Sequence, residues 1–327
     1  MLRRAAAVCL CIALVVSATA EPVDVSIRRI ERFATNMDGD RLAFRGGLVL
    51  RGPTTLSGMS ALLLDGDRML AATDFGKFVT ARLEFEGDQL VGISDVDVTA
   101  RRDLDGRPIT SKVRGDAESL ARGDGEILVY VEEPHLLLAY PADGLDIDRE
   151  ATPRDLKLSL QERRVGAGGM EAMARLPDGR LVLIAEGRDG TGQETPGFFL
   201  GGSRFTVRRR DGFAITGADV LPGGDLLLVE RRYNGGIDIA MRVRRIGADA
   251  LDSGKPADGP ILLEADFSAE IDNMEAIAAE VRDGRIFLTL ASDDNGSIWQ
   301  RTLLLRFEVI DPLPRPNPLR PTAAAIR

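Results

Sequence analysis

Carboxylate side chains recur at similar places along this 327-residue sequence. Glu118, Glu171 and Glu275 each open a short apolar stretch that ends in a small residue. Gly58 and Gly217 take the same place in two further stretches, and successive positions are 46 to 60 residues apart. Each stretch leads to a turn centred on Asp-Gly or Gly-Gly and then to a run of Leu, Val and Ile. The repetition indicates five copies of one structural module.

A second set of acids ends the apolar run that follows each turn. It comprises Asp74, Glu132, Glu186, Glu230, Asp293 and Asp294. Carboxylates that converge without matching cations repel one another, which raises their pKa values or favours a hard divalent cation with oxygen ligands. Ca²⁺ is the natural candidate, with Asn273 and Asn295 as neutral oxygen ligands beside the acids. The alternative is that each acid faces water or pairs with a nearby arginine or lysine.

Other kinds of catalytic chemistry have few residues available. Both cysteines, Cys9 and Cys11, lie in the first twenty residues, so thiolate metal sites and cysteine nucleophiles are excluded from the rest of the chain. His135 is the only histidine and no Gly-x-Ser-x-Gly stretch occurs, so hydrolysis by a Ser-His-Asp triad is not expected. His135 remains a candidate proton carrier. Phosphate-binding loops and dinucleotide fingerprints are also missing from the sequence.

The repeated module predicts an all-β fold. Asp-Gly between two apolar runs is a strong hairpin signal, and nearly unbroken apolar runs such as 226–229 suit strands buried on both faces. Several short strands in each of five modules predict a β-propeller, in preference to a two-sheet sandwich. Strand-like segments at 25–30 and 42–50 make six blades the favoured count and leave five or seven open. We expect these segments to complete the last blade and close the ring.

The two ends of the chain differ in composition from the rest. Residues 1–20 contain Arg3 and Arg4, an apolar run and a small-residue pattern ending at Ala20, which predicts an export signal cleaved there. We therefore expect a periplasmic or extracellular protein. The predicted propeller domain spans residues 21–310, and residues 311–327 form a Pro-rich tail. No later stretch approaches the roughly 20 apolar residues of a membrane-spanning helix.

The charge balance limits the possible partners. Cleavage after Ala20 leaves 40 Lys and Arg against 51 Asp and Glu, a formal net charge near −11. An acidic chain of this kind is a poor partner for nucleic acid or an anionic membrane surface. We expect it to act as a monomer on a small-molecule ester or phosphate.

Four motifs resemble the phytase-like family, also described as esterase-like activity of phytase. They are residues 116–121, 221–232, 272–278 and 292–295, and the resemblance extends over about residues 25–310. That family is similar to β-propeller phytases, which implies a calcium cluster at the channel mouth. Together with Glu171 from the repeat, the expected metal ligands are Glu118, Glu230, Asp272, Asn273, Glu275, Asp293 and Asp294.

Three functions are compatible with these residues. The first is Ca²⁺-assisted hydrolysis of phosphoric esters, with Glu275, Glu118 and His135 as catalytic candidates and substrate held by Arg231, Arg232 and Lys77. The second is a Ca²⁺-dependent carboxylic-ester hydrolase or lactonase. The third is a non-catalytic propeller that binds a ligand or an exported protein. A basic mouth favours phosphate, an acidic mouth with one tight ion favours the lactonase type, and an apolar rim favours binding.

Overall fold

The structure is a computed structural model that describes residues 21–34, 41–163, 169–187, 192–235 and 238–310. The expected export signal and the Pro-rich tail lie outside these ranges. The short helical segments are η1 (Thr54–Leu56), α1 (Lys112–Gly115), α2 (Leu160–Arg163) and α3 (Ala248–Leu251). Within the described ranges, no helix is long and apolar enough to cross a membrane.

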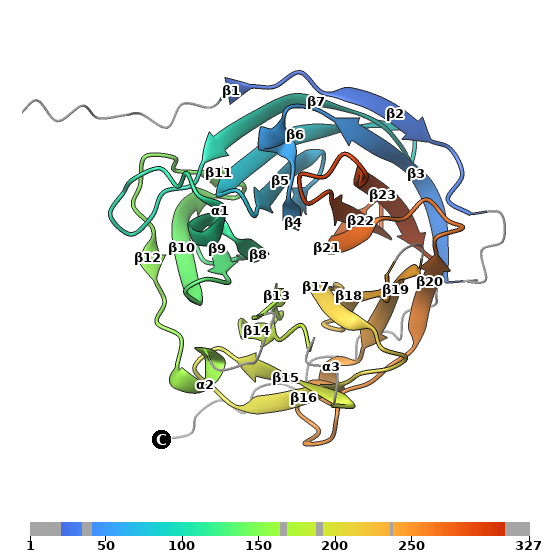
Figure 1. Cartoon of the computed structure of the whole chain (residues 1–327). Coiled ribbons are helices and arrows are strands. Elements are labelled where there is room, and N and C mark those ends of the chain that lie inside the picture. Colours follow the sequence, from blue (N-terminus) through green and yellow to red (C-terminus); the bar gives the residue numbers. More distant parts are fainter. Residues whose placement is uncertain (1–20, 35–40, 164–168, 188–191, 236–237, 311–327) are drawn as a thin grey trace, which may run out of the picture.

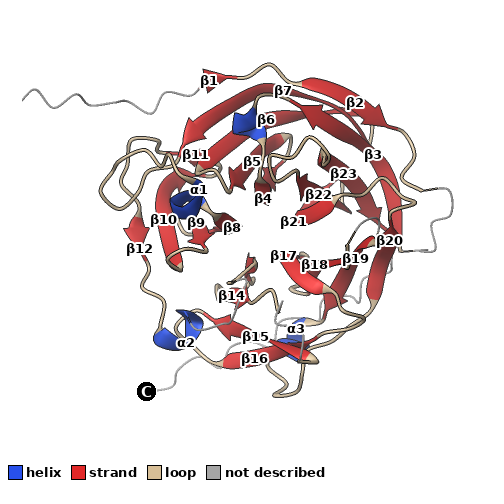
Figure 2. Ribbon diagram, in the orientation of Figure 1, coloured by secondary structure: helices blue, strands red, loops and turns tan. Residues whose placement is uncertain are grey.

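The remaining described elements are strands in five antiparallel sheets, which surround a central channel as the blades of a propeller (Figures 1 and 2). Blade 1 contains, from the channel outward, β4 (Met59–Asp65), β5 (Arg68–Thr73), β6 (Lys77–Glu86), β7 (Gln89–Ala100) and β1 (Glu21–Pro22). Blade 2 contains β8 (Ala117–Arg122), β9 (Glu126–Val131), β10 (Leu136–Asp143) and β11 (Asp146–Ile147), with β12 (Arg154–Asp155) also paired to β10. The predicted all-β propeller is confirmed.

The other three blades follow the same order, with the first strand of each module innermost. Blade 3 contains β13 (Ala172–Arg175), β14 (Leu181–Ile184), β15 (Glu194–Phe199) and β16 (Arg204–Arg208). Blade 4 contains β17 (Ala214–Val220), β18 (Leu226–Tyr233), β19 (Ile239–Ile246) and β20 (Ile261–Asp266). Blade 5 contains β21 (Asn273–Arg282), β22 (Arg285–Asp293), β23 (Thr302–Val309), β3 (Leu42–Arg51) and β2 (Ser26–Ile30).

The ring closes through strands from both parts of the chain. β3 pairs with β23 along most of its length, and β2 pairs with β3, so the front strands complete the blade of the last module as expected. β1 pairs instead with β7 at the outer edge of blade 1. The front strands therefore extend existing sheets and form no sheet of their own. The described residues give five blades, the lower of the counts left open beside six.

The Asp-Gly turns do what their chemistry predicts. β21 and β22 are joined by Asp283 and Gly284 alone, and both residues have positive φ, at 52° and 73°. Two positive φ values characterise the type I′ turn, whose twist matches that of a hairpin. Gly accepts this conformation without a Cβ clash, and Asp tolerates it better than most residues.

Each pair of neighbouring blades encloses its own hydrophobic core. Leu227 and Val229 of blade 4 pack in one cluster with Leu288 and Leu290 of blade 5, and all four are fully buried. Four further clusters fill the remaining interfaces between blades. This arrangement explains the unbroken apolar runs, because strands inside a blade contact other sheets on both faces. The five cores hold the inner strands in fixed positions around the channel.

The inner strands of blades 4 and 5 approach each other closely at Gly217. A Cβ atom added there collides with the backbone oxygen of Glu275 and lies 2.9 Å from Cγ1 of Val229. We expect Gly217→Ala to lower the free energy of unfolding by about 1–3 kcal/mol through overpacking. Denaturant unfolding followed by circular dichroism measures the change.

Gly223→Ala is the matched control for this substitution. A Cβ atom at Gly223 meets nothing within 4 Å, so this variant should unfold like the wild type. Equal stabilities of the two variants would contradict the close approach of the blades.

Candidate active site at the mouth of the propeller channel

One residue from each blade lies at the same level of the channel. In four of the five blades, this residue is the extra residue of a β-bulge in the inner strand. The register shifts by one residue in β4, β8, β17 and β21 near the start of each inner strand. Such bulges re-aim the extra side chain out of the regular ladder. We call the resulting set the inner ring: Ser60, Glu118, Glu171, Thr216 and Glu275.

The inner ring contains three of the acids expected from the repeat. Glu118, Glu171, Glu275 and Ser60 line a common cavity. Thr216 is buried and donates its hydroxyl hydrogen to the backbone oxygen of Met274, 2.9 Å away. The sequence spacing treated Gly58 and Gly217 as the equivalent positions in blades 1 and 4. The ring members there are Ser60, two residues after Gly58, and Thr216, one residue before Gly217.

A second level, the outer ring, comes from the second strand of each blade. Asp74, Glu132 and Glu186 donate their backbone N–H to Gly58, Asp116 and Gly169, each two residues before an inner-ring member. In blade 4 the corresponding residue is Arg231, which pairs with Ala214, and in blade 5 it is Asp293, which pairs with Asn273. The outer ring is therefore Asp74, Glu132, Glu186, Arg231 and Asp293.

The two rings open into a cavity of about 1230 Å³. Nine carboxylic acids and four basic residues line it among the described residues. The acids are Asp74, Asp116, Glu118, Glu132, Glu171, Glu186, Asp272, Glu275 and Asp293, and the bases are Lys112, Arg209, Arg231 and Arg301. The excess of acids makes the cavity strongly attractive to cations.

The channel narrows sharply below the inner ring. The residues two positions further along each inner strand are Leu62, Leu120, Met173, Ala218 and Ile277, and they surround a remaining space of about 10 Å³. Leu62, Leu120, Met173 and Ile277 also belong to the cores between the blades, so the narrow part of the channel lies among apolar side chains. We call these five residues the apolar plug, and the large cavity lies on its ring side.

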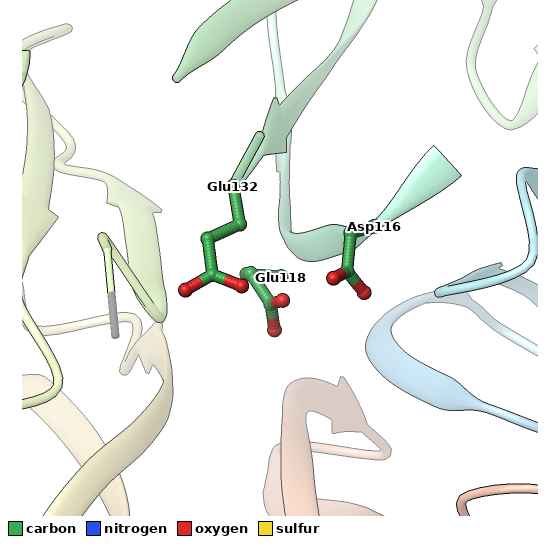
Figure 3. Close-up of side chains that lie close together, drawn as sticks. All are labelled: Asp116, Glu118 and Glu132. Atoms are coloured by element: carbon green, nitrogen blue, oxygen red, sulfur yellow. The ribbon is translucent and has the colours of Figure 1, made fainter. Parts of the chain in front are cut away.

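Asp116, Glu118 and Glu132 of blade 2 form the tightest group of acids (Figure 3). One oxygen atom from each carboxyl group lies within 4.8 Å of the others. Ca²⁺ binds oxygen ligands at about 2.3–2.6 Å, so ligands on opposite sides of one ion are up to about 5 Å apart. The spacing and the hard oxygen donors fit such a cation, and all three residues line the cavity.

Burial and mutual repulsion raise the pKa values of the ring acids. Burial raises the pKa of Glu118 and Glu171 well above their usual range. The carboxylates of Asp74 and Asp116 raise the pKa of Glu118 further, although its hydrogen bond with Glu171 lowers it, and Glu118 raises the pKa of Glu171. The two side chains also share a hydrogen bond. Burial raises the pKa of Glu275 to about 8 although Arg231 opposes the shift, and burial with Asp74 raises the pKa of Asp293 to about 7. Without a bound cation, several ring acids therefore carry protons near neutral pH.

Two basic side chains enter this acidic region. Arg231 is mostly buried and donates Nη1–H to Oε1 of Glu275 at 2.6 Å, while its Nη2 lies 3.5 Å from Oε1 of Glu186. Asn273 donates from Nδ2 to the same Glu275 oxygen at 2.8 Å. On the opposite wall, Lys112 of α1 places Nζ 3.0 Å from Oδ2 of Asp74. Arg231 thus reaches the rings from blade 4, and Lys112 reaches them from the connection between blades 1 and 2.

Of the residues proposed from sequence as metal ligands, Glu118, Glu171, Asp272, Asn273, Glu275 and Asp293 line the cavity. Glu230 lies elsewhere, buried against the guanidinium groups of Arg244 and Arg242 inside blade 4. Asp294 accepts hydrogen bonds from Ser57, Gly58 and Thr302, and so joins blade 5 to the segment before β4.

Three further proposed residues lie outside the cavity lining. Arg232 stacks over the ring of Phe213 at 4.9 Å and lies 3.6 Å from Asp238. Lys77 begins β6, where its backbone N–H donates to Oγ1 of Thr73. His135 has positive φ and its Nδ1 is 2.7 Å from the hydroxyl of Tyr130.

The sequence reasoning missed two charged residues next to the rings, Asp116 and Lys112. Asp116 lies two positions before Glu118, and both residues line the cavity. Because side chains alternate between the two faces of a strand, this spacing was the signal in the sequence that could have identified Asp116. Lys112 comes from a four-residue helix between blades 1 and 2, and no periodic pattern in the sequence marks it.

Solved structures resemble the chain at low sequence identity. Glutaminyl cyclase of Myxococcus xanthus is 16% identical with a TM-score of 0.41, over 89% of this chain and 100% of that chain. The PQQ-bound aldose sugar dehydrogenase of Streptomyces coelicolor is 12% identical with a TM-score of 0.41, over 88% and 99%. An exo-1,5-α-L-arabinanase from a bovine ruminal metagenomic library is 11% identical with a TM-score of 0.44, over 77% and 92%.

Among curated proteins, no sequence matches this chain. A family model described as Phytase-like, esterase-like activity of phytase, matches residues 54–296. Because that match covers well over half of the sequence and includes the inner strands of all five blades, the chain belongs to the phytase-like family.

Proposed function

We propose that this protein is a Ca²⁺-assisted hydrolase of phosphoric esters that acts in the acidic cavity. The observation that carries the proposal is the cluster of Asp116, Glu118 and Glu132, with Lys112 and Arg231 lining the same cavity. Carboxylates supply the oxygen ligands that Ca²⁺ prefers, and basic groups nearby are suited to phosphoryl oxygens. Membership of the phytase-like family agrees with this assignment.

The chain offers more oxygen ligands than the three clustered acids. Glu171 lies against Glu118 through their shared hydrogen bond, and Asp293 and Asn273 line the same cavity from blade 5. Ca²⁺ takes six to eight oxygen ligands, including neutral amide oxygens and water. A bound Ca²⁺ would polarise a phosphoryl oxygen and acidify a water molecule.

The chain's own groups then have defined tasks. Lys112 and Arg231 offset the charge that builds on the phosphoryl oxygens in the transition state. The water oxygen forms a bond to phosphorus while the bond from phosphorus to the alcohol oxygen breaks. One water proton passes to a carboxylate, and a protonated carboxyl group gives a proton to the departing alcohol oxygen. Glu118 and Glu171 are placed for this exchange because they share a hydrogen bond and line the same cavity.

A second candidate function is hydrolysis of a carboxylic ester or lactone. The specific observation in its favour is the excess of nine acids over four bases in the cavity, the acidic mouth expected for the lactonase type, which disfavours substrates of high negative charge. A carboxylic ester is neutral and meets no such repulsion. The same carboxyl groups serve as base and acid in either reaction, so the two candidates differ in substrate and share the site.

The first prediction concerns turnover. Purified protein should hydrolyse a phosphomonoester in the presence of Ca²⁺ and lose activity with a chelator. Glu118→Gln should lower kcat/KM by about 100-fold or more, since general acid–base catalysis contributes about 10²–10⁴-fold. Glu31→Gln, at an exposed acid between β2 and β3, is the matched control and should act like the wild type.

Parallel assays on a phosphodiester and a carboxylic ester separate the candidates. Chelator-sensitive turnover of the carboxylic ester alone would replace the first candidate with the second. No chelator-sensitive turnover of any of the three esters would contradict both.

The second prediction concerns Ca²⁺ binding without turnover. A ligand that binds only the folded state at 100 times its Kd adds about 2.7 kcal/mol of stability, which raises the melting temperature by roughly 5 °C for a chain of this size. We expect this rise on adding Ca²⁺ to the wild type and to Glu31→Gln. The rise should shrink strongly in Asp116→Asn and Glu118→Gln. An unchanged wild-type melting temperature at millimolar Ca²⁺ would count against the metal site.

The third prediction concerns the pH dependence of stability with chelator present. Folding raises the pKa of Glu275 to about 8 and of Asp293 to about 7, so the folded state binds more protons than the unfolded state above about pH 4.5. Their contribution is complete below the unfolded pKa and is lost as pH rises through the folded pKa. The wild type should therefore lose stability relative to Glu275→Gln from about pH 5 to pH 8. Thermal melts across that range measure the difference, and a constant difference would contradict the raised pKa.

A further inference from the structure

The wall of the cavity is divided by chemical character. The lining residues from Ser60 to Glu186, which come from blades 1 to 3 and the connections between them, are all polar or charged. Every side chain larger than alanine that is apolar or aromatic comes from blades 4 and 5 or the loops beside them, within the described residues. These side chains, which we call the apolar wall, are Tyr233, Ile239, Phe267, Ile271 and Trp299.

The aromatic members of the apolar wall are unusually exposed. Trp299 has 88% of its surface accessible, Tyr233 63% and Phe267 57%. They come from three separate segments, at the end of β18, between β20 and β21, and between β22 and β23. Exposed apolar groups gathered around one cavity mark a surface that another molecule covers.

Basic side chains accompany the apolar wall. Arg209 lies between β16 and β17, and Arg301 lies between β22 and β23. Arg301 pairs with Glu270 and Asp272. Arg209 donates only to the backbone oxygens of Phe213 and Gly192, at 3.5 and 3.4 Å, and forms no ion pair within the described part of the chain. Arg209 thus brings a positive charge to the cavity beside the apolar wall.

We infer that the substrate is a singly esterified anion with an apolar, ring-sized alcohol group that lies against Tyr233, Phe267 and Trp299. The inference rests on the proposed function and specifies its substrate class. A cavity of about 1230 Å³ is far larger than one phosphate group and its cation require. The nine lining acids oppose a ligand with several phosphate groups, whereas an apolar substituent meets no such repulsion.

The chain contains its own probe for this contact. Trp299 is the single tryptophan among the 327 residues, so tryptophan fluorescence reports directly on the cavity mouth. Phenylphosphonate and methylphosphonate carry the same ionised group and cannot be hydrolysed at an ester bond. They differ in the apolar substituent alone, which isolates the apolar wall from the metal site.

The experiment titrates each phosphonate into Ca²⁺-loaded protein and follows Trp299 emission. We expect phenylphosphonate to change the emission and to bind about tenfold more tightly than methylphosphonate, the order of magnitude for one buried ring contact. Phe267→Ser and Tyr233→Ser should reduce this preference and leave methylphosphonate affinity unchanged. Val281→Ser, at an exposed apolar residue of β21 outside the cavity lining, is the matched control and should keep the preference.

Different outcomes overturn the inference and the proposed function separately. Equal affinities for the two phosphonates, or a preference that survives both serine variants, overturn the apolar wall as a substrate contact while the phosphoric-ester site stands. No binding of either phosphonate, measured also by calorimetry, overturns the phosphoric-ester assignment and this inference with it. The Ca²⁺-induced rise in melting temperature shows that each variant keeps its fold and its metal site.

Discussion

The convergence of buried carboxyl groups on one axis is the constraint on which the rest of this structure depends. A propeller brings the same position of every blade to the channel, so an acid repeated in the module becomes a ring of acids. Such a ring carries unfavourable repulsion and desolvation unless its charge is reduced. The structure relieves this cost by raising the pKa values of Glu118, Glu171 and Glu275 and by placing Arg231 between Glu186 and Glu275. A divalent cation relieves it more completely.

The scaffold can hold these groups because its stability comes from elsewhere. Five separate hydrophobic cores between the blades fix the inner strands, and the apolar plug of Leu62, Leu120, Met173, Ala218 and Ile277 closes the channel beneath the acids. Apolar side chains on one side of the inner ring lower the local dielectric constant, which strengthens the electrostatic interactions within it. The bulges in the inner strands add the remaining element, because they turn the ring side chains toward the axis without breaking the sheets.

The sequence was sufficient for the architecture and for part of the site. The hairpin turns and the recurring acids identify the module because both depend on local chemistry, Gly at positive φ and acids at strand ends. Glu230 shows where such reasoning fails. Neighbouring residues of a strand point to opposite faces, and an apolar run followed by an acid does not indicate on which face the acid lies. Counting from the turn glycine recovers three members of the outer ring: Glu132, Glu186 and Arg231 lie seven residues after Gly125, Gly179 and Gly224. The distance is eight residues from Gly66 to Asp74 and nine from Gly284 to Asp293, so the count alone does not find these two. Lys112 was beyond prediction, because a short inter-blade helix places it by tertiary packing alone.

Arg231 links the two halves of the cavity, and its position implies how cation and substrate influence each other. It is the one basic member of the outer ring described here, and it is already held by two acids of the rings. A cation on the blade 2 cluster would offset the charge of the neighbouring acids and so reduce the repulsion between the rings and an anion beside the guanidinium group. Anion affinity would therefore rise with cation occupancy, and linkage requires that the anion raise cation affinity by the same factor. On the proposed function, the acidic rings would therefore hold a cation and an anion together, with Arg231 as the base of the outer ring beside the anion.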